Sequence, residues 1–142
     1  MIDKSKLSRQ FDELDKYLKE LEDMKSLSQN EYLSDNRNIY SLRYLLQVSI
    51  ETCINIGNHI ISRHNFGIPN DYSDVFRILE KESIIQSALV SRLIQMVRFR
   101  NRLVHMYWEI NDEVIFEYLQ EHVGDFYEFK REVLGFLEGG RG

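Results

Sequence analysis

Proline occurs once among the 142 residues of this chain, at position 69. Because proline breaks helices, a chain with so few breakers can sustain long helices, and strand-rich folds with many turns are disfavoured. The chain is long enough to bury a hydrophobic core as one domain. Its single cysteine excludes both an intramolecular disulfide framework and a cysteine zinc cluster.

The composition is that of an ordinary globular protein. Hydrophobic residues make up 43% and charged residues 29% of the chain, which argues against wholesale disorder. The formal net charge of −5 disfavours indiscriminate coating of nucleic acid, so we expect no DNA partner, although a local basic site is compatible with it. No apolar run approaches the ~20 residues that span a bilayer, and residues 1–16 contain no signal-peptide stretch. We therefore expect a cytoplasmic protein without a membrane partner.

Apolar residues recur at spacings of three and four in five segments, each of which predicts a helix. The predicted helices lie at about 3–25, 37–64, 72–81, 83–106 and 111–137. Residues 26–36 and 65–70 are predicted to be connections. Short connections favour antiparallel neighbours, so the prediction is an all-α fold, an antiparallel four-helix up-and-down bundle with one additional short helix. Residues 1–142 then form a single domain in which 139–142 are a flexible tail.

Charge is distributed unevenly along the fourth predicted helix. From Ser83 to Trp108 there is no acidic residue, and three of the arginines in this stretch lie close to His105. The arginines are Arg92, Arg98, Arg100 and Arg102. Arginine forks match phosphate oxygens in a two-pronged geometry. Charge alone also fits a plainer interpretation, in which the arginines pair with acidic residues of the first and last helices.

The same stretch combines arginine, histidine and tyrosine, which metal-independent RNA cleavage can use. The imidazole of His105 can take a proton from a ribose 2′-OH or give one to the leaving 5′-oxygen, because its pKa lies near neutrality. An arginine can stabilise the extra negative charge at phosphorus in the transition state. A tyrosine hydroxyl can orient the phosphate. No metal-ligand spacing of histidines and carboxylates is present, so we expect neither metal nor cofactor.

The spacing of these residues constrains how they can meet. Arg100 and His105 are five residues apart, so on an ideal helix they point about 140° from one another, whereas Asn101 and His105 share a face. Three arrangements would bring Arg100 to His105. They are the reach of the arginine, a helix that ends or unwinds near Val104, or a two-fold dimer whose cleft takes residues from both chains.

A polar row interrupts the otherwise apolar helix at 37–64. Its members are Glu51, Asn55, Asn58 and His59. The row either lines the cleft opposite His105, forms a buried hydrogen-bond network between helices, or is the exposed stripe of the helix. The remaining histidines, His64 and His122, are expected to be structural.

The run Arg100-Asn101-x-x-x-His105-x-Tyr107 resembles the motif of the HEPN superfamily, in which an arginine and a polar residue precede a histidine. With the added Tyr107, the run resembles the signature of the HepT-like branch, Arg-x4-His-x-Tyr. The flanking sequences Trp-Glu-Ile-Asn at 108–111 and Asn-Ile-Gly-Asn-His-Ile at 55–60 also resemble that branch. The resemblance covers most of the chain in length, helix order and motif position.

This resemblance implies the toxin of a type VII, HepT/MntA-like toxin–antitoxin pair: a homodimeric, metal-independent endoribonuclease that cleaves tRNA or mRNA in its dimer cleft. It implies that Arg100 binds phosphate, that His105 is the catalytic acid or base, and that Asn101, Arg102 and Tyr107 support them. The implied partner is a minimal nucleotidyltransferase of the MntA type, which attaches AMP to Tyr107. The bulk and negative charge of that group would repel and block a phosphate backbone.

A second interpretation belongs to a different class of protein. The bundle would be a non-catalytic binding module or accessory subunit that docks a nucleotidyltransferase and cuts nothing. The intact Arg100, His105 and Tyr107 favour the enzyme, whereas the acidic net charge slightly favours the module, since RNA-binding enzymes are usually more basic. A neighbouring nucleotidyltransferase gene fits both interpretations, but growth arrest on expression of the chain alone would separate them.

Overall fold

The computed structural model describes residues 3–141, so Gly142 of the predicted tail lies outside the described residues. The structure is 85% helical, and the described residues contain no strand, which confirms the predicted all-α class. The α-helices are α1 (Lys4–Lys25), α2 (Gln29–Leu33), α3 (Asn36–His64), α4 (Tyr72–Lys81), α5 (Ser87–His105) and α6 (Asp112–Phe136). A 3₁₀ turn, η1 (Tyr107–Glu109), joins α5 to α6, and a π-helical turn, η2 (Leu137–Arg141), follows α6.

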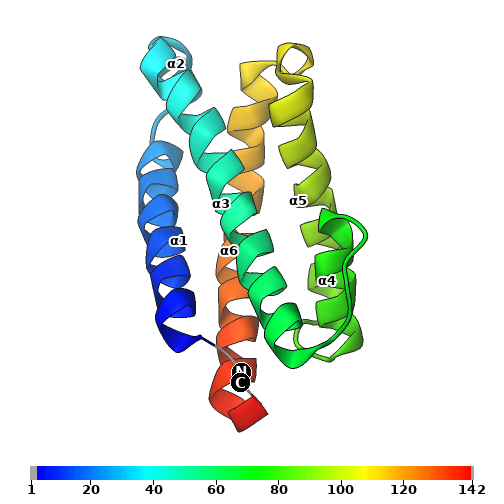
Figure 1. Cartoon of the computed structure of the whole chain (residues 1–142). Coiled ribbons are helices and arrows are strands. Elements are labelled where there is room, and N and C mark those ends of the chain that lie inside the picture. The colour runs from blue at the N-terminus through cyan, green and yellow to red at the C-terminus, as the bar shows by residue number, and fades with distance from the viewer. Residues whose placement is uncertain (1–2, 142) are drawn as a thin grey trace.

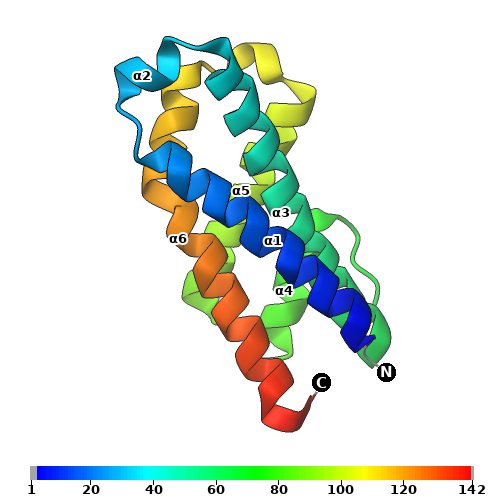
Figure 2. The same ribbon diagram turned by 90° about the vertical axis from the view of Figure 1, so that its left-hand side faces the viewer.

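The four long helices run alternately up and down, as predicted (Figure 1). Helix α3 contacts every other α-helix, which explains why its sequence is apolar on most sides. Helix α1 crosses the face formed by α3 and α6 (Figure 2), and α4 packs beside α3 and α5. The end of α5, η1 and the start of α6 lie at the end of the bundle that also holds α2 and the start of α3.

Local signals in the sequence explain where two of the helices begin and what they bury. The Asp3 side chain caps α1 by accepting from the backbone N–H of Lys6 at 3.0 Å. The buried face of α1 is the predicted apolar one, namely Leu7, Phe11, Leu14, Leu18 and Leu21. Asn111 caps α6 as predicted, accepting from the N–H of Val114 at 2.9 Å.

Two segments differ from the prediction. Residues 26–36 contain the short helix α2, whose Ser28 and Glu31 form a capping box and whose Tyr32 is fully buried against Phe116. Helix α5 begins at Ser87 rather than near 83, because Ser83 adopts a left-handed conformation with φ of 60°. The apolar residues Ile84 and Ile85 are buried in that turn, so their hydrophobicity reflects the core and not a helical period.

Helices α3 and α4 approach each other closely at a glycine. A Cβ at Gly57 would lie 2.5 Å from Cγ1 of Val75, so only glycine permits this contact. The only cysteine, Cys53, is fully buried nearby on α3. Helix α3 ends at His64, and its C-cap residue Asn65 is left-handed with φ of 55°. Within the described residues, no helix has the length and apolarity needed to cross a membrane.

Candidate active site

The predicted motif occupies the last turns of α5 and the η1 turn. His105 is the last residue of α5, because Met106 leaves the helical conformation with φ of −139° and ψ of 39°. His105 is exposed, and so are the rings of Tyr107 and Trp108, at 59% and 67% respectively. These two rings pack edge to face with their centroids 5.2 Å apart. The motif therefore presents a histidine beside an exposed aromatic surface.

Arg100 is held by contacts from three elements. Its Nε and Nη2 donate to the same oxygen of Glu51 on α3, Oε2, at 2.9 and 2.7 Å. Its Nη1 donates to Oδ1 of Asn101 at 3.1 Å. Its Cζ lies 5.2 Å from the centroid of the Tyr72 ring at the start of α4, within the range of a cation–π contact. Only 13% of the Arg100 side chain is exposed, so its guanidinium is fixed in position.

Arg100 and His105 do not meet within one chain. Helix α5 ends at His105, one residue beyond Val104, but Arg100 and His105 both still belong to the helix, so this helix end does not turn them toward each other. The Arg100 side chain extends toward Glu51 on α3 and donates to it, rather than extending toward His105. The third arrangement, a cleft shared by two chains, involves a second copy of this chain and stays a prediction.

The predicted polar row of α3 divides into two parts. Glu51 lies beside the motif, where its Oε2 also accepts from Nε2 of Gln47 at 3.2 Å. The other three, Asn55, Asn58 and His59, line a separate groove beside Lys6 of α1. His59 lies about 12 Å further along the helix axis than Glu51. Within one chain, therefore, only Glu51 of this row is placed beside the motif.

His59 is a buried histidine that joins two helices. Its Nε2 accepts from the backbone N–H of Asp3, at the cap of α1, at 3.1 Å. Burial lowers the pKa of His59, and the nearby cations Lys6 and Arg63 act in the same direction. This contact matches the interpretation of the row as a hydrogen-bond network between helices.

Arg43 of α3 is a residue of the site that sequence reasoning missed. Its Nη1 donates to the carbonyl of Tyr107 at 3.0 Å, its Nη2 to the carbonyl of Ile110 at 2.8 Å, and its Nε to Oδ1 of Asp112 at 3.0 Å. One guanidinium thus fixes η1 to the start of α6. No local pattern could reveal this contact, because Arg43 precedes its partners by more than 60 residues.

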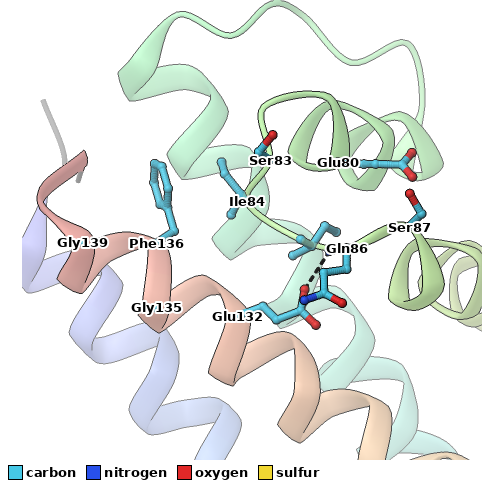
Figure 3. A pocket seen from close by; sticks show the side chains of 10 residues that line it. Glu80, Ser83, Ile84, Gln86, Ser87, Glu132, Gly135, Phe136 and Gly139 are labelled. Atoms are coloured by element: carbon cyan, nitrogen blue, oxygen red, sulfur yellow. Dashed lines mark hydrogen bonds between the residues drawn. The ribbon is translucent and has the colours of Figure 1, made fainter.

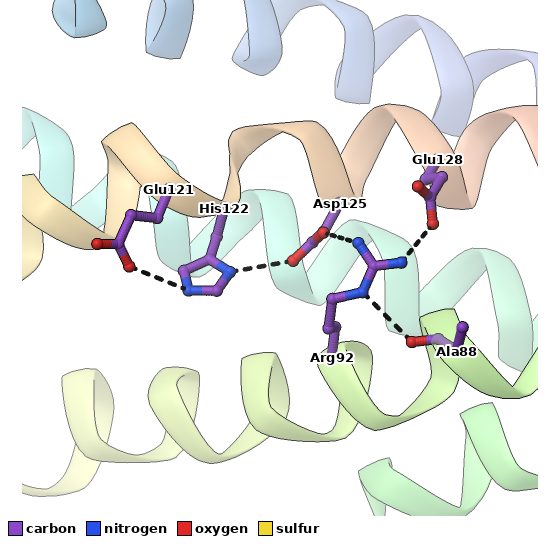
Figure 4. Close-up of polar contacts among 6 residues, drawn as sticks. All are labelled: Ala88, Arg92, Glu121, His122, Asp125 and Glu128. Carbon is purple, nitrogen blue, oxygen red and sulfur yellow. Dashed lines mark hydrogen bonds and ion pairs between the residues drawn. The ribbon is translucent and has the colours of Figure 1, made fainter.

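The four arginines of the acid-free stretch have different surroundings. Arg92 pairs with Asp125 at 2.6 Å and with Glu128 at 2.7 Å, both on α6, as the plainer interpretation predicts (Figure 4). Arg100 pairs with α3 rather than with the first or last helix. Arg98 and Arg102 are exposed and have no ion pair within the described part of the chain. Two positive charges are therefore available to a ligand.

A cavity of about 730 Å³ lies away from the motif (Figure 3). It is formed by the turn before α5 and the end of α6, where the N–H of Gln86 donates to Oε1 of Glu132 at 2.7 Å. Its walls include Glu80 and Glu132, so its charge does not suit a phosphate. Among the described residues, no cluster of three histidine, cysteine or carboxylate side chains could hold a metal ion.

The helical bundle and the Arg-x4-His-x-Tyr motif at the end of α5 define a HEPN-type domain. A family model described as Ribonuclease HepT-like matches residues 14–133. The chain belongs to the ribonuclease HepT-like family. The predicted family is thus confirmed, and the prediction of a HEPN-type endoribonuclease is confirmed at the level of that family.

Two curated relatives carry nuclease names. An mRNA nuclease HepT of Shewanella oneidensis is 38% identical over 84 residues, which cover 59% of this chain and 63%, less than two thirds, of the relative. A tRNA nuclease HepT of Aphanizomenon flos-aquae is 26% identical over 122 residues, covering 86% and 83% of the two chains. Among solved structures, a tri-AMPylated Shewanella oneidensis HEPN toxin in complex with MNT antitoxin matches with a TM-score of 0.84. The two sequences are 27% identical, and the match covers 95% of this chain and 99% of the toxin chain.

Proposed function

We propose that this chain is a metal-independent endoribonuclease toxin that acts on tRNA or mRNA and is silenced by a nucleotidyltransferase antitoxin. The observation that carries the proposal is the intact motif, in which His105 is exposed at the end of α5 and Arg100 is held rigidly on Glu51. The nuclease names of the two curated relatives support it. We assign both proteins of the pair to the cytoplasm.

The chemistry follows from the residues of the motif. His105 takes the proton of a ribose 2′-OH, whose oxygen attacks the adjacent phosphorus while the bond from phosphorus to the 5′-oxygen breaks. The leaving 5′-oxygen accepts a proton from water or from the His105 imidazolium formed in the first transfer, and the product end is a 2′,3′-cyclic phosphate. Arg100 stabilises the charge that develops at phosphorus. Asn101 accepts from Arg100 through Oδ1, so its amide N–H groups can donate to a phosphate oxygen.

We propose a homodimer as the active form. A rigid Arg100 on one face of α5 and an exposed His105 on another support a site that is completed by a second chain. The exposed Met106 and Trp108 provide apolar surface beside His105 for such an interface. In the dimer, Arg100 of one protomer would act with His105 of its partner, and Arg102 would add positive charge to the same cleft.

Tyr107 is the proposed acceptor of AMP. Its ring is exposed while its carbonyl is fixed by Arg43, so an MntA-like nucleotidyltransferase can reach a well-positioned hydroxyl. The transferred AMP adds a negative phosphate next to the arginines and excludes a second phosphate by charge and by volume. The AMPylated state of the structural relative supports this assignment.

The test is RNA cleavage by purified, unmodified protein in EDTA. We expect the parent to cut total RNA, His105→Ala to lose more than about 100-fold in rate, and the remote exposed variant Tyr127→Ala to cut like the parent. Circular dichroism establishes that both variants are folded, and mass spectrometry excludes AMP on Tyr107. If His105→Ala cut as fast as the parent, the site assignment would be wrong.

One observation favours the non-catalytic binding module as a second candidate. The charge of Arg100 is already matched by Glu51 within the same chain, so less of it is available to a phosphate. A module would bind the nucleotidyltransferase and leave RNA intact in the assay above. The absence of cleavage by unmodified parent protein would therefore select this candidate.

A further inference from the structure

Besides the motif, a groove between α5 and α6 is a candidate ligand site, with a volume of about 460 Å³. Its walls are Arg92, Gln95, Arg98, Phe99 and Arg102 from α5 and Tyr118 and His122 from α6. Among the described residues, this lining contains three arginines and no carboxylate. In a chain with a net charge of −5, the groove is a locally basic surface.

The floor of the groove is aromatic. The rings of Phe99 and Tyr118 stack with their centroids 3.9 Å apart and their planes within 3° of parallel. The His122 ring lies 4.6 Å from that of Tyr118, which extends the aromatic surface toward the arginines. Single-stranded nucleic acids bind grooves of this kind, where positive side chains contact the phosphates and aromatic rings contact the bases.

One end of the groove is fixed by a chain of polar contacts (Figure 4). The buried Asp125 accepts from Nη1 of Arg92 at 2.6 Å and lies 3.1 Å from Nδ1 of His122, while Glu128 accepts from Nη2 of Arg92. These contacts neutralise Arg92 and set the orientation of the imidazole. Arg98 and Arg102 remain as the positive side chains of the groove that have no acidic partner in the described part of the chain.

The two arginines share a face of α5 with His105. Residues 98, 102 and 105 are separated by four and then three positions, so they lie within about 60° of one another around the helix. Arg102 is about 6 Å beyond Arg98 along the axis, and His105 is about 4.5 Å further. The groove therefore opens on the side of α5 that also carries the histidine of the motif, whereas Arg100 lies on another face.

We infer that the α5–α6 groove is a subsite for single-stranded RNA. In this subsite Arg102 and Arg98 bind successive backbone phosphates next to the bond cleaved at His105, and the nucleosides rest on Tyr118 and His122, with the buried Phe99 ring stacked against Tyr118. The inference rests on the proposed ribonuclease function and extends it from the reacting phosphate to the neighbouring nucleotides. An RNA strand accounts for both the paired arginines and the aromatic floor, whereas an acidic peptide accounts only for the arginines.

The test measures RNA binding separately from cleavage. His105→Ala provides an inactive background, in which a fluorescent 12-nucleotide single-stranded RNA is titrated at several salt concentrations. We expect Arg98→Gln combined with Arg102→Gln to weaken binding at least about tenfold at low salt. The slope of log affinity against log salt should fall by about 1.4, since each lost phosphate contact on a single strand contributes about 0.7.

The matched control removes the same charge elsewhere. Arg9 and Arg131 are exposed and lie outside the groove, so the double variant Arg9→Gln with Arg131→Gln should keep the parental slope. With His105 intact, Arg98→Gln alone should raise KM for the 12-nucleotide RNA and leave kcat within about twofold, because Arg98 lies outside the motif.

Three results would overturn the inference. If the groove variant with both substitutions bound RNA with the slope of the control while the parent cut RNA, the subsite would be wrong and the ribonuclease function would stand. If the parent neither bound nor cut RNA, both proposals would fail. If the groove variant kept RNA binding but lost association with the nucleotidyltransferase, the groove would be a protein-docking surface.

Discussion

Glu51 shows how a single carboxylate can set the geometry of a motif that lies on another helix. Its Oε2 accepts from two nitrogens of Arg100 and from Nε2 of Gln47, so three donors converge on one oxygen. Charge-assisted hydrogen bonds of this kind are short and directional. The arginine of the motif is therefore already positioned in the free protein, which would reduce the entropy lost on binding of the proposed phosphate ligand.

Arg43 performs the corresponding task for the tyrosine of the motif. We expect Arg43→Ala to free η1 and to lower the free energy of unfolding by about 1–3 kcal/mol, because it leaves the partly buried Asp112 and two carbonyls without their donor. Arg43→Lys should restore little, since one ammonium cannot reproduce three contacts of a planar fork.

Urea denaturation measures the stability change for Arg43, and hydrogen exchange at residues 106–110 measures the release of η1. Arg37→Ala is the control, because Arg37 is 91% exposed and pairs only with nearby Asp35. Equal exchange at 106–110 in Arg43→Ala and in the parent would show that Arg43 does not hold the turn.

At the scale of the element, the spacing of apolar residues predicted where most helices lie. The predicted positions were wrong where a helix was too short to show this spacing or where apolar residues lie in a buried turn. Helix α4 lies at its predicted residues, and the buried face of α1 is the predicted one. Helix α2 was missed because its five residues are too few to show a period, although the Ser28–Glu31 capping box was readable in the sequence. The predicted start of α5 was wrong because Ile84 and Ile85 are buried in the core although they lie in a turn.

Replacing each of two helical glycines with alanine should have opposite effects on the stability of the protein. Gly57→Ala should destabilise the protein by about 1–3 kcal/mol, because the new methyl group would lie 2.5 Å from Val75 and force α4 outward. This cost exceeds the gain in helix propensity of about 1 kcal/mol. At Gly124 nothing lies within 4 Å of an added Cβ, so Gly124→Ala should instead stabilise by up to about 1 kcal/mol.

Thermal and urea denaturation of the two glycine variants provide the measurement. The comparison separates close packing from helix propensity, since both substitutions add the same methyl group inside a helix. A stabilised Gly57→Ala variant would show that α4 can shift at little cost.

For the molecule as a whole, the sequence was sufficient to locate the motif but not the residues that surround it in the fold. The spacing of Arg100, Asn101, His105 and Tyr107 was sufficient to name the motif, because it is local. Their partners Arg43 and Tyr72 come from distant parts of the chain and gave no local signal. Glu51 was identified as polar on an apolar helix, but its pairing with Arg100 depends on how α3 and α5 pack.

The Asp3 N–H donates a hydrogen bond to Nε2 of His59, which joins the start of α1 to α3. Because His59 titrates, this contact should make the free energy of unfolding of the whole bundle depend on pH. The folded state lowers the pKa of His59 below 6.5, its ordinary value, so the unfolded chain binds a proton more readily. The free energy of unfolding should therefore fall as the pH decreases below about 6.5. It should approach a constant for this group below the folded pKa.

The measurement is the Tm between pH 7.5 and 5. His59→Gln is the matched variant, because its amide can accept from the Asp3 N–H but does not titrate in this range. The decrease in Tm between pH 7 and 5 should be smaller in His59→Gln than in the parent. Parallel curves for the two proteins would show that His59 does not couple pH to folding.

The buried Cys53 has a practical consequence for spectroscopy. Burial raises the pKa of this thiol, and its side chain is inaccessible, so it should resist maleimide and methanethiosulfonate reagents. A cysteine introduced at an exposed position such as Glu113 would then be the only reactive thiol in a chain with its natural Cys53 retained. One spin label per protomer would be attached without further engineering, and a dipolar distance between two labels would report directly on how two copies face each other.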